Sequence, residues 1–517
     1  MGKGKRAHTI STPTLELPSL SHFLQKPAVA TPQLLSPPVS PQGEPRWIAP
    51  RHPKRQYVDL QHPMEAVPFF ILISTYLNYF CLILLGHMHD LLGKLLQPSA
   101  YTHLQTQGGY APLVSDFDSF YTRRLYMRIR DCEVRECLNL ASYNYLGFAQ
   151  AAGPCADAVE KACHLRGLTT AALPGDHSTE LHHELERRVA RFVGKPDALV
   201  ISMGFATNAT TLPALTHRGC LLISDELNHA SIIFGARLSG AHVRVFKHNN
   251  MRDLEAVLRE AISQGMPRTH RPWKKIMVVV EGLYSMEGTI VNLPELVQLK
   301  KRYKFYLYVD EAHSIGALGE HGGGICDFYG IDPAHIDILM GTFTKSFGAA
   351  GGYIAASTHI IQYLRTHNHA YIYAETMPIP VTRQIMASMK IICGQDGTDN
   401  GKRRIRQLAD NAYYFARRLR EMGFIVYGDH GSPVVPLLLF NPAKISAFSR
   451  ELLKRDIAVC VVGYPATPII SSRARFCLSA AHTREDIDRA IETISEVGDL
   501  LMLKLSKKGQ TKTTLMR

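Results

Sequence analysis

Short runs of β-branched and other apolar residues follow one another between positions 198 and 311, and helical patterns lie between some of them. The runs read ALVISM, GCLLISD, HVRVF, KIMVVVE and FYLYVDE, and glycine or polar residues bound them. The patterns LEAVLREAIS and LPELVQLKKRY have the apolar period of helices. This alternation predicts an α/β fold with a mainly parallel sheet covered on both faces. Because ligands bind beyond the carboxyl ends of such strands, the residues there are the functional candidates.

The chain of 517 residues is long enough for more than one domain. Ten prolines and no apolar period in the first 60 residues predict disorder there. After Gly394, long helical patterns surround short strands, which predicts a smaller C-terminal α+β domain. The predicted parts are a disordered segment at 1–60, a membrane segment at 61–100, an arm that packs with the small domain at 101–150, a large domain at 151–394, a small domain at 395–505 and a basic tail at 506–517.

The segment Val67–Gly86 contains 20 residues without a charge. That length can cross a bilayer, although a buried core helix would have a similar pattern. The sequence HMHDLLGKLL, which follows, would suit an interfacial helix. Basic residues are denser before the segment than after it, so the positive-inside rule would place the N-terminus in the cytosol and the C-terminal part across the membrane. The sequence leaves open whether the segment spans the bilayer or lies in one leaflet.

Composition argues against two classes of function. The ten cysteines form no Cys-x-x-Cys pair and have no zinc-like spacing, which indicates reduced thiols and no metal site. The net charge of +13 could indicate nucleic-acid binding, but the basic residues are dispersed and no recognition motif accompanies them. A basic surface near anionic lipid or an acidic acyl donor is therefore the preferred interpretation.

Polar side chains follow the predicted strands. The stretch VISMGFATN opens a helix at Gly204 and Phe205, and free backbone N–H groups at such a turn can hold a phosphate. Three further strand ends supply titratable or hydroxyl groups: Asp225 and His229 in ISDELNHAS, Glu281 and Ser285 in VVVEGLYSMEG, and Asp310 and His313 in LYVDEAHSIGALG.

The stretch MGTFTKSFGAAGG places Lys345 among threonines, glycines and a phenylalanine, with no carboxylate nearby in sequence. No metal-ligand spacing accompanies Asp310 and His313, no G-x-S-x-G elbow occurs, and GGGICDFYG does not follow a strand as a dinucleotide loop must. A desolvated lysine has a lowered pKa and can condense with a carbonyl group. Pyridoxal phosphate (PLP) supplies that carbonyl and needs an anion cradle, a flat ring partner and a carboxylate, which the strand ends offer.

The motifs GFATN, SDELNHAS, EGLYSMEG, DEAHSIGALG and GTFTKSFGAAGG together resemble the α-oxoamine synthase family of fold-type I PLP enzymes. The similarity covers roughly Tyr110 to Leu505 and is strongest to lysine-bearing catalytic subunits of the eukaryotic branch that condenses L-serine with palmitoyl-CoA. The resemblance implies a fold-type I PLP-dependent transferase fold, preceded here by a membrane-associated helix, and an acyltransferase that acts in sphingolipid synthesis. It also implies that the protein is located at the endoplasmic reticulum membrane, with its catalytic domain facing the cytosol. It further implies that the protein binds a non-catalytic partner subunit and small activating and regulatory membrane subunits.

Two alternatives remain open at this point. One is a family member that uses glycine or alanine with another acyl-CoA. The other is an inactive, PLP-binding scaffold subunit, although the family's non-catalytic partner lacks the lysine that is present here.

The resemblance implies roles for individual residues at the reacting end of the cofactor. Lys345 would bind the cofactor aldehyde and later move the substrate Cα proton. Asp310 would keep the pyridine nitrogen protonated, and His229 would stack on the ring and help to orient the substrate carboxylate. His313 and Ser285 would bond around the phenolic oxygen of the ring.

Other residues would hold the charged ends of the ligands. The resemblance assigns the cofactor phosphate to the backbone of Gly204 and Phe205 together with Thr342 and Thr344. It assigns the amino-acid carboxylate to Arg475, in the stretch RARFCLSAAHT. Gly463 stands where bacterial members carry a further arginine, and the stretch Arg166–Glu186 lacks the arginine of the family's glycine-rich loop.

Overall fold

The computed structural model describes residues 67–106, 109–112, 115–116, 120, 136–171, 180–464 and 466–506. The predictions for 1–60 and for the tail from 507 onward lie outside these residues. So do positions 172–179 of the stretch Arg166–Glu186, which we call the altered loop because it lacks the family's arginine. The chain divides into two units at position 46, and every described residue belongs to the second unit. The domain boundaries given above stay predictions.

The described residues contain a seven-stranded sheet with the order β2-β8-β7-β6-β5-β3-β4. Strands β3 to β7 run parallel to one another, and β8 is antiparallel to both of its neighbours, which confirms the predicted mainly parallel sheet. The strands are β2 (Asp197–Ile201), β3 (Cys220–Asp225), β4 (His242–Phe246), β5 (Lys275–Glu281), β6 (Tyr306–Asp310), β7 (Ile338–Thr342) and β8 (Gly352–Ala356).

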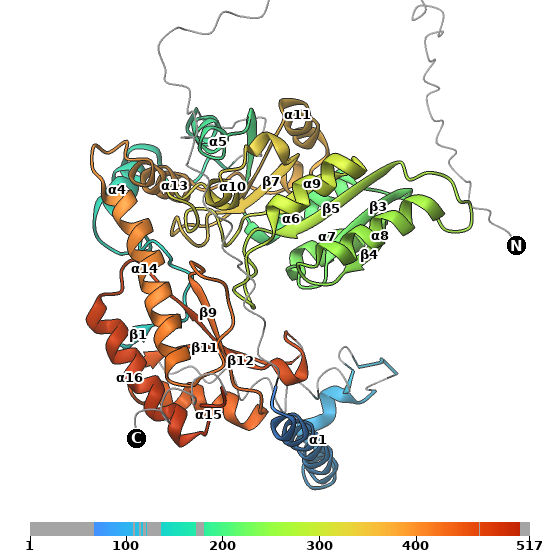
Figure 1. The fold of residues 1–517 in the computed structure, drawn as a ribbon, viewed down its shortest axis with the longest axis vertical. Helices are drawn as coiled ribbons and strands as arrows, with labels where there is room; N and C mark the ends of the chain where they lie inside the picture. The colour runs from blue at the N-terminus through green and yellow to red at the C-terminus, as the bar shows by residue number, and fades with distance from the viewer. Residues whose placement is uncertain are drawn as a thin grey trace, which may run out of the picture. The chain divides into compact units, whose positions relative to one another are not determined.

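Both faces of the central strands are buried. In β5, Val278 and Val280 belong to the core on one face, whereas Met277 and Val279 belong to the core on the other. The first core includes residues of α8 (Met251–Gln264), α9 (Leu293–Tyr303) and α10 (Gly324–Tyr329). The second includes residues of α6 (Gly204–Leu215), α7 (Ala230–Ser239), α11 (Thr358–His367) and α12 (His369–Tyr373). Figure 1 labels β7, β5, β3 and β4 of this sheet, with α6, α7, α8 and α9 beside them. Burial on both faces explains why these strands are continuous apolar runs.

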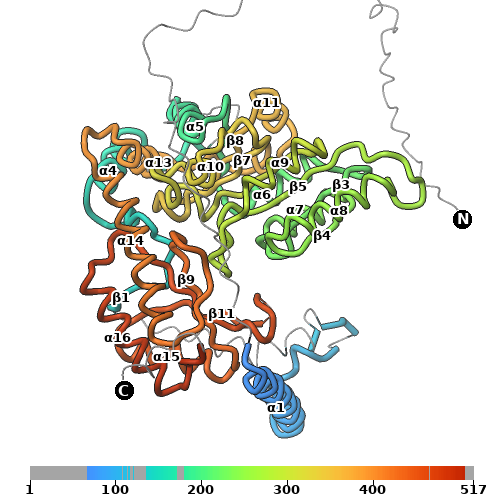
Figure 2. The backbone as a smooth tube through the Cα atoms, in the orientation of Figure 1, coloured from blue at the N-terminus to red at the C-terminus, as the bar shows by residue number. Residues whose placement is uncertain are grey.

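A smaller antiparallel sheet, with the order β11-β12-β9, lies in the C-terminal part. Figure 2 shows the helices α14, α15 and α16 of this part, with β1 (Leu138–Asn139) among them. This strand pairs in parallel with β10 (Ile457–Ala458), so residues near position 139 join the C-terminal part of the fold. The other elements here are α14 (Asn400–Glu421), β9 (Val434–Leu438), α15 (Pro442–Leu453), β11 (Cys460–Val462), η5 (Ile469–Ser471), β12 (Arg473–Cys477) and α16 (Arg484–Leu500).

Three further helices pack together, and one of them, α5 (Glu180–Phe192), contacts β2 and β8 of the large sheet. The others are α4 (Pro154–Arg166) and α13 (Ile379–Ile392), and α13 packs against both α4 and α5. His182 of α5 hydrogen-bonds through Nε2 to the carbonyl oxygen of Met377, at 2.7 Å. These contacts fix the helical layer beside the two ends of the altered loop.

Helix α1 (Phe69–Leu96) is continuous for 28 residues, so the uncharged segment and the predicted interfacial segment form one helix. Its buried residues, Thr75, Tyr79, Gly86 and Asp90, lie on the stripe that packs toward η2 (Pro98–Leu104), η5 and α15. Many of its other side chains are large, apolar and exposed, Phe70 and Leu96 at 78% among them. Within the described residues, α1 alone is long and apolar enough to cross a membrane, and it is compatible with membrane association.

Candidate active site

Parallel pairing brings the ends of β5, β6 and β7 to one edge of the large sheet. Glu281 pairs with Asp310, and Asp310 pairs with Met340, two residues before Thr342. The segment 343–351 then returns directly into the antiparallel β8. A connection this short cannot hold a crossover helix, so the chain turns back beside β7 and carries Lys345 at the same edge.

Asp310 is a buried carboxylate with a fixed orientation. Its Oδ2 accepts a hydrogen bond from Asn208 Nδ2 at 2.7 Å, and its Oδ1 accepts one from the backbone N–H of Ala312 at 2.8 Å. The Asn208 amide is itself oriented, because its oxygen accepts a hydrogen bond from the Tyr308 hydroxyl at 2.7 Å. Asp310 is only 3% exposed, and no described cation lies within ion-pair distance of it. A protonated ring nitrogen is a ligand group that fits such a carboxylate.

Lys345 is half-buried, and its amine makes one long hydrogen bond among the described residues. Its Nζ lies 3.4 Å from Thr342 Oγ1 and 5.5 Å from the centre of the Tyr143 ring. Burial lowers the pKa of Lys345, and Arg475 lowers it further, although the nearby carboxylates of Asp310 and Glu281 oppose this shift. A lowered pKa increases the fraction of neutral amine, which is the form that attacks a carbonyl carbon.

His229 lies at the start of α7 and faces the same region. Its Nδ1 accepts a hydrogen bond from the backbone N–H of Ser231 at 3.2 Å, and its own backbone N–H donates to Glu281 Oε1 at 2.5 Å. Desolvation by the surrounding protein lowers the pKa of His229, and the Lys345 cation lowers it too, against the attraction of Asp310. The ring of Phe205 lies 6.3 Å from the imidazole, centre to centre.

Glu281 accepts the hydrogen bond from the His229 backbone and is itself buried, at 3% exposure. Burial raises the pKa of Glu281 well above its usual value, and the neighbouring Asp310 charge raises it further.

The phosphate cradle proposed from sequence lies at the start of α6. The first intrahelical backbone hydrogen bond there is donated by Thr207, so the N–H groups of Gly204 and Phe205 are free to bind an anion. A Cβ on Gly204 would lie 3.2 Å from the Thr342 methyl group, so a side chain would crowd the end of β7. Thr344 donates to the Thr342 hydroxyl at 3.2 Å, which places both hydroxyls beside this helix start.

His313 lies after β6 and is held by Tyr145, which follows β1. The Tyr145 hydroxyl and His313 Nδ1 are 2.8 Å apart, and both side chains are buried. Burial lowers the pKa of His313 well below its usual value, so the ring is neutral at physiological pH. The ring of Tyr143 packs edge-on against the imidazole at 5.2 Å and also faces Lys345 and Arg475.

Arg475 reaches the site from β12. Its guanidinium lies 4.6 Å from the centre of the Tyr143 ring, and its Nη atoms contact the sulfur atoms of Met286 and Cys460 at 3.6 and 3.5 Å. The Nε atom is buried and has no hydrogen-bond partner among the described residues. Because sulfur is a weak acceptor, this cation is poorly satisfied and fits a carboxylate ligand. Ser285, next to Met286, is buried at the same place.

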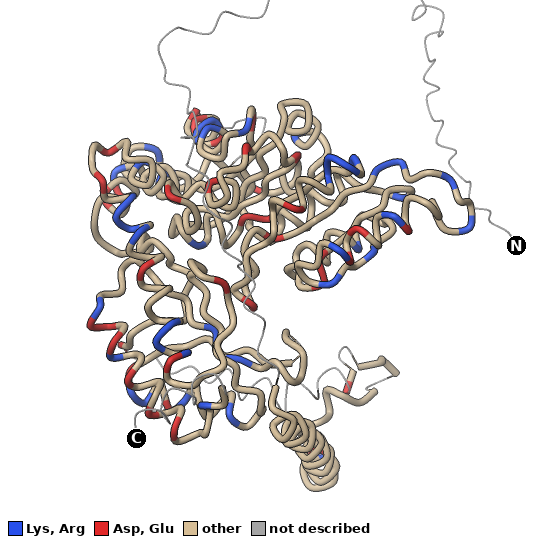
Figure 3. Tube along the Cα trace, in the orientation of Figure 1, with Lys and Arg blue, Asp and Glu red and all other residues tan. Residues whose placement is uncertain are grey.

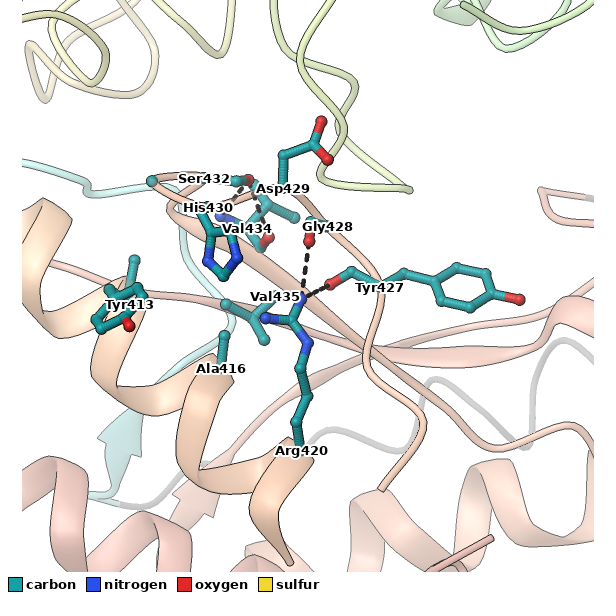
Figure 4. Close-up of a pocket in the computed structure, with 12 residues that line it drawn as sticks. Tyr413, Ala416, Arg420, Tyr427, Gly428, Asp429, His430, Ser432, Val434 and Val435 are labelled. Atoms are coloured by element: carbon teal, nitrogen blue, oxygen red, sulfur yellow. Dashed lines mark hydrogen bonds between the residues drawn. The ribbon is translucent and has the colours of Figure 1, made fainter. Parts of the chain in front are cut away.

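The turn that carries Ser285 is held by the C-terminal part of the chain. Arg473 donates to the Met286 carbonyl oxygen at 2.8 Å and to Glu287 Oε1 at 3.1 Å. Asp429 binds the same turn, since its N–H donates to the Gly288 carbonyl at 3.0 Å and its Oδ2 accepts from the N–H of Ile290 at 2.8 Å. Figure 4 shows this Asp429 loop, with the guanidinium of Arg420 bonded to the Gly428 carbonyl oxygen, 2.8 Å away.

The residues present fit PLP. They offer a desolvated amine, an oriented buried carboxylate, a helix start with free N–H groups, and a buried guanidinium nitrogen without a partner. All the predicted site residues lie in the described part of the chain. The contacts above come from the large sheet with its helix starts, from the segment after β1 and from β12 of the small sheet. The roles assigned to them stay predictions. Tyr143 and Tyr145 were missed, although the ASYNYLGFA motif to which they belong could have directed attention to them.

Comparison with known proteins gives concordant results. The family model described as aminotransferase class I and II matches residues 135–494. "Serine palmitoyltransferase 2" of Schizosaccharomyces pombe is 53% identical over 472 residues, which cover 85% of this chain and 78% of that protein. A solved Sphingomonas wittichii serine palmitoyltransferase matches with a TM-score of 0.65 and 28% identity, over 71% of this chain and 88% of that one. A solved serine palmitoyltransferase containing PLP has the same TM-score and 27% identity, over 71% and 89% of the two chains.

The family match covers the large sheet, the lysine turn and the C-terminal sheet. Together with the solved structures, it confirms the fold-type I transferase fold and the PLP dependence expected from the motifs. The chain therefore belongs to the class I and II aminotransferase family of PLP enzymes and, within it, to the serine palmitoyltransferase 2 group.

Proposed function

We propose that this protein is the catalytic subunit of a serine palmitoyltransferase, which condenses L-serine with palmitoyl-CoA to give 3-ketodihydrosphingosine. In this reaction a bond forms between serine Cα and the thioester carbonyl carbon, and the carbon–sulfur bond breaks to release CoA. The serine carboxyl group leaves as CO₂, and a proton is returned to the same carbon. The observation that carries the proposal is that the desolvated Lys345 amine lies at the same edge of the large sheet as Asp310.

Five side chains would bind the reactive part of PLP. When bound, PLP supplies a conjugated electron sink for the negative charge left on the substrate Cα. Lys345 would link to its aldehyde carbon, Asp310 would face the pyridine nitrogen, and His229 would lie against the ring. His313 and Ser285 would bond near the phenolic oxygen, and the neutral His313 offers one N–H donor or acceptor there.

The remaining predicted residues would hold the anionic groups. The backbone N–H groups of Gly204 and Phe205, with the hydroxyls of Thr342 and Thr344, would bind the phosphate. Arg475 would pair with the serine carboxylate and orient its Cα–H bond toward the Lys345 amine. That orientation matters because a neutral amine close to the Cα can accept the proton only when the bond points at it.

The membrane assignments are also proposals. We infer that α1 anchors the protein at the endoplasmic reticulum membrane, with the catalytic domain facing the cytosol, because its exposed apolar side chains suit lipid. We further infer a heterodimer with the non-catalytic long-chain-base subunit 1 of serine palmitoyltransferase, together with small activating and regulatory membrane subunits. These inferences rest on the family resemblance.

The test uses the full chain co-expressed with its partner subunit and purified with PLP. We expect a visible absorbance band that changes on addition of L-serine, and long-chain ketone product on addition of palmitoyl-CoA. Borohydride treatment followed by peptide mass analysis should locate the cofactor on Lys345. The variant Lys345→Ala should lose both band and product, whereas Lys301→Ala, a change of an exposed lysine on α9, should retain both.

Each alternative has its own outcome. A band that responds to glycine or alanine and not to serine would favour another amino-acid substrate. A serine-responsive band without product would favour a PLP-binding scaffold subunit. If the protein stays colourless with excess PLP and Lys345 remains unmodified, the proposal is wrong.

A further inference from the structure

A hollow lies at the opposite edge of the large sheet from the candidate active site. Three segments form it, each at the amino end of β3, β4 or β5. Among the lining residues that they contribute are Arg218, His242, Met266, Thr269, Arg271 and Trp273. Its volume is about 390 Å³, which is within the range of small-molecule sites. Since a strand rises about 3.3 Å per residue, the six-residue β3 separates the two edges by roughly 20 Å.

The side chains at this basic hollow carry positive charge without a matching negative charge. Arg218 and Arg271 line it. Arg268 and Lys274 belong, like Arg271, to the α8–β5 loop, and blue segments mark basic residues at the right-hand end of Figure 3. Within the described residues, none of these four cations forms an ion pair, and no acidic residue lines the hollow. Cations gathered in this way repel one another, and an anionic ligand would remove that repulsion.

Aromatic rings form one wall of the basic hollow. The rings of His242 and Trp273 stack at 5.4 Å with an angle of 24° between their planes. The Trp273 indole N–H donates to the Ala261 carbonyl oxygen at 2.8 Å, so this ring is anchored to α8 and has no donor left for a ligand. The wall therefore offers flat apolar contact, while the guanidinium groups offer the polar contacts.

The loop that carries these groups is ordered by its own backbone. The N–H of Met266 donates to the Arg271 carbonyl at 2.8 Å, and the N–H of His270 donates to the Met266 carbonyl at 2.9 Å. Arg268 and His270 adopt left-handed backbone conformations, with φ of +69° and +52°. Residues other than glycine rarely adopt that conformation, and where they do the surrounding structure holds them there. The basic side chains of this segment are therefore attached to a loop whose backbone is held by its own hydrogen bonds.

We propose that the basic hollow binds a phosphate-bearing anion, with Arg218 and Arg271 on the phosphate oxygens and the Trp273–His242 pair against the rest of the ligand. Guanidinium groups bind phosphate through paired, charge-assisted hydrogen bonds, and the absence of any lining carboxylate favours a ligand with more than one negative charge. The phosphate could belong to a soluble compound or to a lipid headgroup. The site is separate from the chemistry proposed for Lys345.

Trp273 makes the test direct, because Trp47 is the only other tryptophan in the chain. In a Trp47→Phe background, the full-length protein carries a single indole at the wall of the basic hollow. We expect inorganic pyrophosphate to change its fluorescence in a saturable manner, with an apparent Kd that rises with salt concentration. Replacing Arg218 and Arg271 together by glutamine should raise that Kd by at least about tenfold. The matched control Arg406→Gln, on the exposed face of α14, should leave it unchanged.

A second probe identifies the source of the phosphate. Water-soluble dibutanoyl phosphatidylinositol 4-phosphate is titrated beside pyrophosphate, with dibutanoyl phosphatidylcholine as the neutral-headgroup control. Tighter binding of the phosphoinositide supports a lipid headgroup, and tighter binding of pyrophosphate supports a soluble ligand. The proposal is overturned if neither phosphate probe gives a saturable change, or if the double variant binds them as tightly as the parent while its circular dichroism spectrum is unchanged. Neither readout depends on catalytic activity, so these results are independent of the proposed function.

Discussion

Removal of the Glu287 charge should weaken both the fold and the binding of the amino-acid substrate. Glu287 and Arg473 are 6% and 2% exposed, and their side chains are 3.1 Å apart. Arg473 also donates to the carbonyl oxygens of Met286 and Ser471, both at 2.8 Å, so it cannot turn toward water without losing these bonds. The variant Glu287→Ala would therefore leave a buried guanidinium without its anion.

The expected cost follows from this burial. Breaking a buried ion pair by removal of one partner costs about 3–5 kcal/mol, which is a large part of the stability of a typical domain. The variant Glu287→Gln keeps an oxygen that can accept the Arg473 hydrogen bond, so we expect a smaller cost of about 1–3 kcal/mol. Burial raises the pKa of Glu287 and Arg473 opposes the shift, so loss of Arg473 should raise that pKa further.

The assay separates folding from substrate positioning. Thermal unfolding gives the loss of stability, and steady-state kinetics at varied L-serine gives KM and kcat. Met286 contacts both Arg473, through its carbonyl, and Arg475, through its sulfur. Displacement of this turn should therefore raise the serine KM more than it lowers kcat. The control Glu492→Gln, on the exposed side of α16, should change neither the unfolding temperature nor the serine KM.

The reasoning would be refuted if Glu287→Ala unfolded at the same temperature as the parent protein and had the same serine KM. A loss of stability with an unchanged KM would keep the ion pair as a structural element but would remove its role in positioning Arg475. A double-mutant cycle with Arg473→Met measures the coupling energy directly, because replacing both partners removes the unpaired charge.

Three further variants test other contacts. Burial raises the pKa of Asp429 to about 6, so the folded state favours its protonated form and wild-type stability falls as pH rises from 4 through 6. Asp429→Asn should abolish up to about 3 kcal/mol of this pH dependence, as measured by urea unfolding at each pH. Gly348→Ala should destabilise by more than about 2 kcal/mol in thermal unfolding, because φ is +61° and the new Cβ would lie 2.6 Å from the Ala149 nitrogen. Asn208→Leu should weaken PLP binding at least about tenfold in equilibrium dialysis, because it removes the hydrogen bond that orients Asp310.

The sequence predicted the central strands well because their signal is local. The runs of the central strands β3, β5 and β6 are buried on both faces, so nearly every residue in them must be apolar. The edge strand β4 is mostly exposed, and its run HVRVF is accordingly less apolar. The observed strands lie within or beside the predicted runs. The pattern LPELVQLKKRY coincides with α9, where Asn292 caps the start and Lys304 adopts a left-handed conformation at the end. The direction of β8 had no local signal, because it follows from the shortness of the 343–351 connection.

The site shows the same division between local and long-range information. Strand ends of a parallel sheet meet at one edge, so Asp310, His313 and Lys345 could be grouped from the order of the strands alone. Tyr143 could not, because its position depends on the pairing of β1 with β10 in the C-terminal part of the chain. Arg475 was found through the family resemblance, since an arginine in the central strand of a small sheet has no signature of catalysis.

The placement of Arg475 has a consequence for the order of events in the proposed reaction. Its cation helps to lower the pKa of Lys345, and both side chains face the ring of Tyr143, at 4.6 and 5.5 Å. A lowered pKa suits the first task of the lysine, because the neutral amine is the nucleophile. It suits the second task less well, because a weaker base accepts the Cα proton less readily. A substrate carboxylate bound to Arg475 would cancel much of that cation's repulsion and raise the basicity of Lys345 at the stage at which a proton must be taken up. The guanidinium on the small sheet can therefore bind the substrate and also adjust the lysine on the large sheet to its two successive tasks.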